Sequence, residues 1–143
     1  RHAGAASVTQ VEANDQRRAH AGAVAPSEVS AEAGVVVDCT GNPAAIEDGL
    51  RRVARGGRYL LMGVAAPDQT ATFSPFAVYD NEITIVGSRS LLWSFDRAVR
   101  LNLGLTDALV THRHPLAGYP QALEQMRAGQ GRKHLITPEG ETP

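Results

Sequence analysis

Cysteine and lysine are almost absent from this chain of 143 residues: Cys39 is its one cysteine and Lys133 its one lysine. A single thiol excludes an intramolecular disulfide framework and any zinc site that is built on several thiolates. No apolar run approaches the roughly 20 residues that span a bilayer, and the first residues form no apolar signal core. These absences favour a soluble, cytoplasmic protein that has no membrane partner.

An excess of charge of either sign is missing as well. Fourteen basic residues stand against fifteen acidic ones, so the formal net charge is −1. Such a balance gives nucleic acid or an anionic membrane surface nothing to bind. The content of 43% hydrophobic and 20% charged residues is that of a globular protein, and the length is that of one domain.

Three apolar segments have the pattern of strands in a parallel sheet. Residues 35–37 are consecutive valines without alternation, which predicts a strand that is buried on both faces. Residues 58–64 and 83–87 have the same character, and each runs into glycine near its carboxyl end. A helix is predicted between the first two strands, from residues 42–43 to the glycine pair 56–57, with an apolar face formed by Ile46, Leu50 and Val53.

The rest of the chain alternates between the same two kinds of element. Strands are predicted over residues 7–11, 23–25 and 133–137, with an edge strand over 70–76 and a short extended segment at 109–110. Helices are predicted between a cap at Asn14 or Asp15 and Gly22, from about Ser94 onward, and over residues 119–127. This order predicts an α/β fold with a mainly parallel, doubly wound sheet.

Sheets of this type bind ligands beyond the carboxyl ends of their strands. At four such ends the chain has small residues or an acid, namely Glu12, Thr40–Gly41, Gly63–Val64 and Gly87–Ser88. Small residues let a flat ligand approach the backbone, and a carboxylate can accept both hydroxyl protons of a ribose. The pattern predicts a dinucleotide site in which Glu12, Gly63 and Ser88 line one cleft. From the residues alone, a solvated acid is the commoner explanation of Glu12.

Two further features have a structural explanation beside a functional one. His112 and His114 would share a face of a strand, as a metal-binding pair does, but no third ligand is near them in the sequence. Cys39 is a candidate nucleophile, which we place at a buried strand end where a thiol is unreactive.

The arginines at positions 51, 52 and 55 are compatible with a basic patch, but the solvated face of an amphipathic helix explains them better. Trp93 fits a partner surface and burial beneath the neighbouring helix equally well.

Segments 35–65, 73–88 and 108–136, which include the motifs VVVDCTGNP, RYLLMGV, EITIVGS and THRHPL, occur in a fixed order. Together they resemble the second half of the zinc-dependent medium-chain alcohol and polyol dehydrogenases, the sorbitol and threonine dehydrogenase branch in particular. The resemblance extends from about Arg1 to Pro138. It implies a partial Rossmann-type, dinucleotide-binding domain over residues 1–138, followed by a disordered tail over 139–143.

The resemblance also implies roles for individual residues. Glu12 would hold the adenosine ribose and favour NAD over NADP, with Arg17 beside that ribose. The remaining cofactor contacts implied are Thr40 and Gly41 in the cofactor groove, Met62, Gly63 and Val64 at the nicotinamide ribose, Ser88, Arg89 and Ser90 at the carboxamide, and Lys133 near the pyrophosphate. The segment from Thr70 to Phe76 would pair across a homodimer.

Departures from the family pattern are as informative as the matches. The family's first strand and its G-x-G-x-x-G loop are not found in this sequence, and neither are the zinc ligands of the preceding catalytic domain. Three connections between predicted elements, around positions 22, 34 and 104, look shorter than is usual in the family. Because the missing strand is central to the family's sheet, we expect a truncated copy that is marginally stable as a monomer.

We therefore predict the NAD(P)-binding half of an alcohol or polyol dehydrogenase, inactive by itself and without a metal site. The alternatives are a non-catalytic nucleotide-binding or dimerisation module and a gene remnant without activity.

Overall fold

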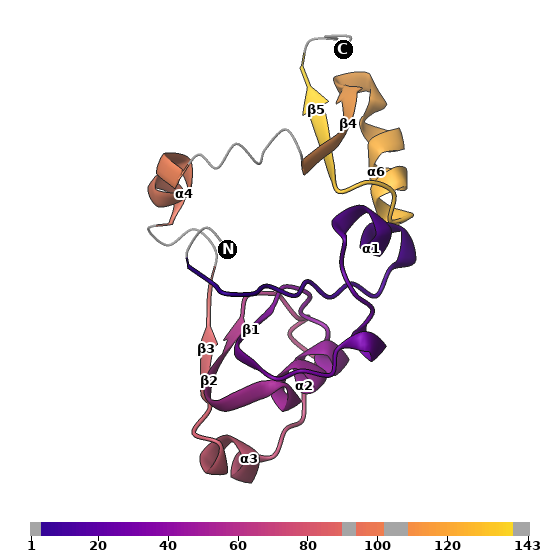
Figure 1. Cartoon of the computed structure of the whole chain (residues 1–143). Helices are drawn as coiled ribbons and strands as arrows, with labels where there is room; N and C mark the ends of the chain where they lie inside the picture. The colour runs from indigo at the N-terminus through magenta and orange to yellow at the C-terminus, as the bar shows by residue number, and fades with distance from the viewer. Residues whose placement is uncertain (1–3, 90–93, 102–108, 139–143) are drawn as a thin grey trace. The chain divides into compact units, whose positions relative to one another are not determined.

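The computed structural model describes residues 4–89, 94–101 and 109–138 (Figure 1). The chain divides into two compact units. Unit 1 consists of residues Arg1–Ser30 and Leu101–Pro143, and unit 2 consists of residues Ala31–Arg100. Ser90, Trp93, Leu103 and the predicted tail 139–143 lie outside the described residues. None of the described helices has the length and apolar character that a membrane span requires.

Unit 2 is built on a sheet of three parallel strands, as predicted. These are β1 (Ala33–Asp38), β2 (Val53–Leu61) and β3 (Thr84–Gly87), in the order β1-β2-β3. Val36 pairs with Tyr59, which pairs in turn with Ile85. All three strands therefore end at the same edge of the sheet.

Helix α2 (Pro43–Arg51) connects β1 to β2 and covers one face of the sheet. Asn42 caps the helix, since its side chain accepts a hydrogen bond from the amide of Ala44. Ile46 and Leu50 of α2 pack against Val53 and Tyr59 of β2 to form the buried core.

The predicted end of this helix at the glycine pair 56–57 is wrong, because α2 stops at Arg51. The carbonyl of Arg52 accepts the amide of Ala33, so the chain enters the sheet at Val53. The pairing of β1 with β2 then shifts register, and Gly56 takes a left-handed φ of 71° at this irregularity.

The predicted burial of residues 35–37 on both faces is also wrong. Val35 is 63% exposed and Val37 is 45% exposed. β1 pairs only with β2 in the described sheet, and α2 covers the face that carries Val36. The other face of β1 is open to solvent.

Residues 70–76 do not form the predicted edge strand. The pairing of this segment across a homodimer stays a prediction. Helix α3 (Pro75–Asp80) begins inside this segment. Ser74 caps it by accepting the amide of Ala77, and Pro75 occupies its first turn, which is a favourable helix start. Helix α4 (Phe95–Leu101) follows β3, close to the predicted start.

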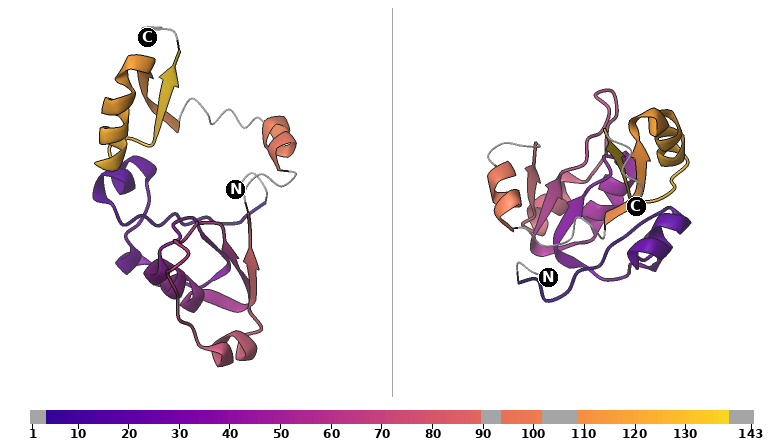
Figure 2. Two further views of the ribbon diagram at one scale, coloured as in Figure 1. Left: turned by 180° about the vertical axis from the view of Figure 1, so that it is seen from behind. Right: turned by 90° about the horizontal axis from the view of Figure 1, so that it is seen from above.

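Unit 1 contains a second pair of parallel strands, β4 (Val110–Pro115) and β5 (Lys133–Thr137). The short helix η2 (Leu116–Gly118) and helix α6 (Tyr119–Arg127) connect them, and α6 lies along one side of the strand pair (Figures 1 and 2). Helix α6 and strand β5 have the predicted bounds. The N-terminal part of the unit contributes α1 (Asp15–Ala21) and η1 (Pro26–Glu28).

The predicted strands 7–11 and 23–25 are reduced to one isolated bridge between Val11 and Val24. The amide of Glu12 donates to Val24 at 3.1 Å, and the amide of Val24 donates to Gln10 at 2.9 Å. A strand needs a continuous ladder of such bonds, and the described residues provide no further neighbour for this segment.

Candidate functional site

The carboxyl edge of the sheet in unit 2 brings the ends of β1, β2 and β3 together. Asp38 is in register with Leu61, and Leu61 is in register with Gly87. The amide of Ser88 donates to the carbonyl of Leu61 at 2.9 Å, so the chain beyond β3 stays beside the end of β2. The predicted groups at residues 40–41, 62–64 and 88–89 thus follow three adjacent strands of one sheet.

Asp38 holds two of these loops in place. Its carboxylate accepts the amide of Thr40 at 3.0 Å, the hydroxyl of Thr40 at 2.6 Å and the amide of Gly41 at 2.9 Å. Its main-chain carbonyl accepts the amides of Met62 at 3.0 Å and Gly63 at 2.8 Å. One buried residue therefore fixes both the loop after β1 and the loop after β2.

The sequence pattern did not predict a role for Asp38. The available signal was an acid at the carboxyl end of a valine strand, followed two residues later by Thr40-Gly41. A short acidic side chain in that place can accept the amides of the turn that follows it.

Gly41 and Gly63 are required by the contact between these two loops. A Cβ atom at Gly41 would lie 2.3 Å from the carbonyl carbon of Val64, and Gly41 has a left-handed φ of 67°. A Cβ atom at Gly63 would lie 2.2 Å from the amide nitrogen of Gly41. At both glycines the space that a Cβ atom would take is thus filled by backbone of the chain itself. The predicted approach of a ligand to them stays a prediction.

The residues around these glycines present an open surface. Thr40, Met62, Ser88 and Arg89 are exposed, and Val64 is 93% exposed. A Cβ atom at Gly87 would meet nothing within 4 Å. A flat ligand therefore has access to the backbone at the end of β3, which fits a dinucleotide at this edge.

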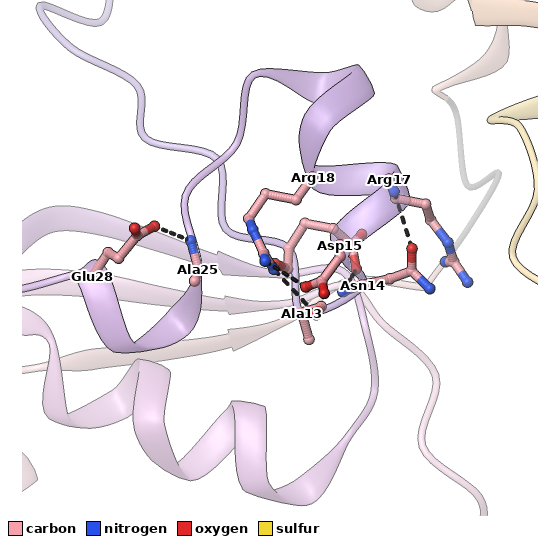
Figure 3. A network of polar contacts seen from close by, with 8 residues as sticks. Ala13, Asn14, Asp15, Arg17, Arg18, Ala25 and Glu28 are labelled. Atoms are coloured by element: carbon pink, nitrogen blue, oxygen red, sulfur yellow. Dashed lines mark hydrogen bonds and ion pairs between the residues drawn. The ribbon is translucent and has the colours of Figure 1, made fainter.

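Glu12, Arg17 and Lys133 belong to unit 1. One carboxylate oxygen of Glu12 accepts the amide of Asn14 at 2.9 Å, and the carbonyl of Glu12 accepts the guanidinium of Arg18 at 3.0 Å. Asn14 caps α1 by accepting the amide of Arg17 at 3.0 Å, and Gly22 ends the helix with a left-handed φ of 60°, as predicted (Figure 3). Lys133 is exposed at the start of β5.

A cleft shared by Glu12, Gly63 and Ser88 stays a prediction, because these residues are divided between the two units. The prediction that Cys39 is buried is wrong. Its thiol is exposed, since β1 ends at Asp38 and Cys39 begins the loop.

Three histidines stack on the strand pair of unit 1. The rings of His112 and His134 lie 4.5 Å apart and nearly parallel, and Nε2 of His114 lies 3.0 Å from Nδ1 of His134. Nε2 of His134 in turn lies 2.9 Å from the carbonyl of Gln130. Within the described parts of the chain, no group of three or more histidine, cysteine, aspartate or glutamate side chains is arranged to hold a metal ion. These residues therefore do not fit a zinc centre.

Comparison with known proteins identifies the family. A family model described as zinc-binding dehydrogenase matches residues 21–101, which is more than half of the chain. The chain is 37% identical over 107 residues to D-arabinitol dehydrogenase 1 of Uromyces fabae. The matched region covers 73% of this chain and 31% of that protein. It is 33% identical over 116 residues to L-threonine 3-dehydrogenase of Caldanaerobacter subterraneus subsp. tengcongensis, with coverages of 74% and 32%.

Solved structures have the same fold. An alcohol dehydrogenase from Thermotoga maritima superimposes with a TM-score of 0.80 at 25% identity, covering 95% of this chain and 44% of its own. A zinc-binding dehydrogenase from Sinorhizobium meliloti 1021, bound to NADP, gives a TM-score of 0.84 at 21% identity, with coverages of 96% and 46%. An alcohol dehydrogenase from Escherichia coli CFT073, complexed with NADH, gives 0.79 at 18% identity, with coverages of 92% and 44%.

The chain spans about a third of the length of these curated relatives and less than half of each solved structure. The expected α/β class, with parallel strands and a partial Rossmann-like architecture, is confirmed by these neighbours. With more than half of its residues matched by the family model, this chain belongs to the zinc-binding dehydrogenase family.

Proposed function

We propose that this chain forms the nicotinamide-dinucleotide-binding part of an alcohol or polyol dehydrogenase. The observation that carries the proposal is the carboxyl edge of unit 2, where three parallel strands end together and Asp38 fixes two of the following loops. The names of the relatives, arabinitol and threonine dehydrogenases, support a reaction that transfers a hydride between a secondary alcohol and nicotinamide. NADP and NADH bound to neighbours of the same fold support the cofactor class.

The residues of the chain would share the cofactor as the family resemblance implies. At the edge of unit 2, the exposed backbone near Thr40, Met62 and Ser88 would contact the nicotinamide half. From unit 1, Glu12 and Arg17 would contact the adenosine ribose, and Lys133 the pyrophosphate. The bound nicotinamide supplies the hydride acceptor, while this chain binds and orients it.

NAD is the preferred nucleotide in this proposal. One oxygen of the Glu12 carboxylate is engaged by the amide of Asn14, which fixes the side chain at the start of α1. A fixed negative charge beside the ribose accepts its hydroxyl protons and repels the 2′-phosphate of NADP.

Calorimetric titration of the full chain with NAD and NADP tests the proposal. NAD should bind more tightly than NADP, and Glu12→Gln should shift the ratio of the two affinities by about tenfold toward NADP. Glu32→Gln, at an exposed glutamate, is the matched control and should leave the ratio unchanged. Absence of NAD binding, or an unchanged ratio in the Glu12 variant, would refute the assignment.

Turnover is expected to be absent from the isolated chain, because its described residues hold no group of metal ligands. NAD reduction with sorbitol, threonine or simple alcohols as substrates is the direct assay. Measurable turnover by the pure chain would contradict this part of the proposal.

A further inference from the structure

Asp38 is the only acidic residue that is buried in the described parts of the chain, and the proposed function gives it no role. It is 6% exposed at the end of β1, so it is not placed to contact a ligand itself. Its hydrogen-bond partners beyond the sheet are Thr40, Gly41, Met62 and Gly63, which are all expected to contact the cofactor. A buried acid between two such loops can act on ligand binding only through them.

Both carboxylate oxygens of Asp38 are used by the β1 loop, which we define as residues 39–42. Oδ1 accepts the amide of Thr40 at 3.0 Å and its hydroxyl at 2.6 Å, and Oδ2 accepts the amide of Gly41 at 2.9 Å. The hydroxyl oxygen of Thr40 in turn accepts the amide of Asn42 at 3.0 Å. This arrangement needs an acceptor at each of the two side-chain positions, which a carboxylate has and a carboxamide lacks.

The same carboxylate lies directly behind the β2 loop, which we define as residues 62–65. A Cβ atom at Gly63 would lie 2.7 Å from Oδ2 of Asp38 and 2.6 Å from the amide nitrogen of Thr40. In the other direction, a Cβ atom at Gly41 would lie 2.3 Å from the carbonyl carbon of Val64. Because the backbone of each loop packs on the other without a gap, a shift of the β1 loop must move the β2 loop as well.

The residues proposed for the adenosine end of the cofactor have supports of their own. Glu12 accepts the amide of Asn14 at 2.9 Å, and Asn14 accepts the amide of Arg17 at 3.0 Å. Both bonds lie within unit 1, whereas Asp38 belongs to unit 2. A change at Asp38 should therefore affect the nicotinamide end of the proposed site and leave the adenosine end as it is.

We propose that Asp38 is a positioning residue for the nicotinamide end of the site, which couples the β1 loop to the β2 loop so that both keep or lose their shape together. Loops that are ordered before the ligand arrives lower the entropic cost of binding it. The effect on nicotinamide binding rests on the proposed function, whereas the coupling between the loops does not. Two experiments separate these parts.

Backbone order parameters from NMR relaxation of the full chain, without any ligand, test the coupling. In Asp38→Asn the order parameters of both loops should fall from about 0.85 toward about 0.6, while those of β2 stay near 0.85. The β2 loop should loosen although the main-chain carbonyl of residue 38, which accepts the amides of Met62 and Gly63, is retained. A lower global stability alone would not change these values, because they report motion within the folded state. Asp80→Asn, at an exposed acid of α3, is the matched control.

Calorimetric titration with NAD and with ADP, which lacks the nicotinamide, tests the effect on binding. Asp38→Asn should weaken NAD about tenfold and leave ADP unchanged, whereas a partly unfolded variant would weaken both equally. Thr40→Val removes the hydroxyl that donates to Oδ1 of Asp38 and should weaken NAD about fivefold. Because Thr40 acts in part through Asp38, the double variant should lose about tenfold, as Asp38→Asn does alone, rather than the product of the two losses.

Circular dichroism verifies the fold of each variant, and Thr40→Val, at an exposed residue, replaces Asp38→Asn in both experiments if the latter does not fold. Loosening of the β1 loop alone, equal losses of NAD and ADP, or losses that multiply in the double variant would overturn the proposal. An unaltered chain that does not bind NAD would refute the proposed function and the nicotinamide role of Asp38 with it, while the order parameters would still decide whether Asp38 couples the loops.

Discussion

Asp38 shows how a single side chain can position a surface on which other residues act. Its carboxylate and carbonyl accept hydrogen bonds from Thr40, Gly41, Met62 and Gly63, so it links the ends of two adjacent strands. A charged acceptor contributes more per bond than a neutral one, roughly 1.5–3 kcal/mol. The shape of the candidate site therefore depends on a residue that is itself buried.

Asp38→Asn should destabilise unit 2 by about 2–4 kcal/mol. The amide of asparagine has one acceptor oxygen, so an NH₂ group would face the amide of Thr40 or of Gly41. Urea unfolding measures the loss. Asp68→Asn, in an exposed turn, is the control and should change stability by less than about 0.5 kcal/mol. Equal stability of the two variants would show that these bonds do not hold the loops.

Tyr59 makes the chain sensitive to alkaline pH. The residue is 1% exposed, and its hydroxyl finds no hydrogen-bond partner among the described residues. Burial, together with the charges of Asp38 and Asp48, raises the pKa of Tyr59 to about 12. Since the tyrosine of the unfolded chain ionises near pH 10, stability is intact below that value and falls as the pH rises toward 12.

Tyr59→Phe should abolish this alkaline loss and should cost no stability at neutral pH, because it removes a buried hydroxyl that has no partner. Urea unfolding at about pH 8 and about pH 11 gives the free energy of unfolding at each pH, and the difference between the two values is the alkaline loss. Tyr79→Phe, at an 80% exposed ring, is the matched control and should retain the loss. A Tyr59→Phe variant with an undiminished alkaline loss would contradict the burial argument.

At the scale of elements, α2 and the sheet approach closely because Gly49 faces Tyr59. A Cβ atom at Gly49 would lie 2.9 Å from Cε2 of the tyrosine ring and 3.0 Å from its hydroxyl oxygen. Glycine inside a helix ordinarily costs about 1 kcal/mol relative to alanine. Close packing of the helix on the ring thus explains a residue that helix propensity disfavours.

Gly49→Ala should therefore destabilise the chain by about 1–3 kcal/mol, although the same change in an unpacked helix is stabilising. Thermal or urea unfolding shows whether the substitution lowers or raises the stability of the chain. Gly34→Ala, in β1, is the matched control, because a Cβ atom there meets nothing within 4 Å and no positive φ is involved. A stabilised Gly49→Ala would mean that the ring moves aside without cost.

Several elements follow from local sequence, and others do not. Helix α6 and strand β5 form over the predicted residues, since the proline in the first turn of α6, the apolar periodicity and the glycine breaks agree there. The strand predicted over residues 70–76 does not form, because Ser74 and Pro75 start a helix there. Helix α2 ends earlier than predicted, because Val53 pairs with β1. The partner of a strand is a long-range property, and periodicity cannot supply it.

At the scale of the whole molecule, the two units differ in how much they bury. In the described parts of the chain, unit 2 buries the apolar side chains of Ile46, Leu50, Val53 and Tyr59, whereas the only apolar side chain buried in unit 1 is that of Ala122. Burial of apolar surface is the dominant favourable contribution to folding. The two units should therefore differ in local stability.

Hydrogen exchange should reflect this difference. Amides of β2, which pairs on both sides, should exchange at least about tenfold more slowly than those of β4 and β5. Residues 7–11 should show little protection, since one bridge is their only described pairing. Peptide-resolved exchange by mass spectrometry gives these rates. Equal protection of β2 and β4, or strong protection of residues 7–11, would contradict the prediction.

By itself, the sequence determined the α/β class, most helix and strand positions, the family resemblance and the strand ends where a ligand is expected. These properties depend on local periodicity, caps and glycine placement, which are encoded within a few residues. Only the tertiary structure decided that Asp38 holds two loops, that the loops of Gly41 and Gly63 contact each other, that Cys39 is exposed and that His112, His114 and His134 stack together. Each of these depends on which segments distant in sequence come into contact, and that is settled only when strands and helices pack together.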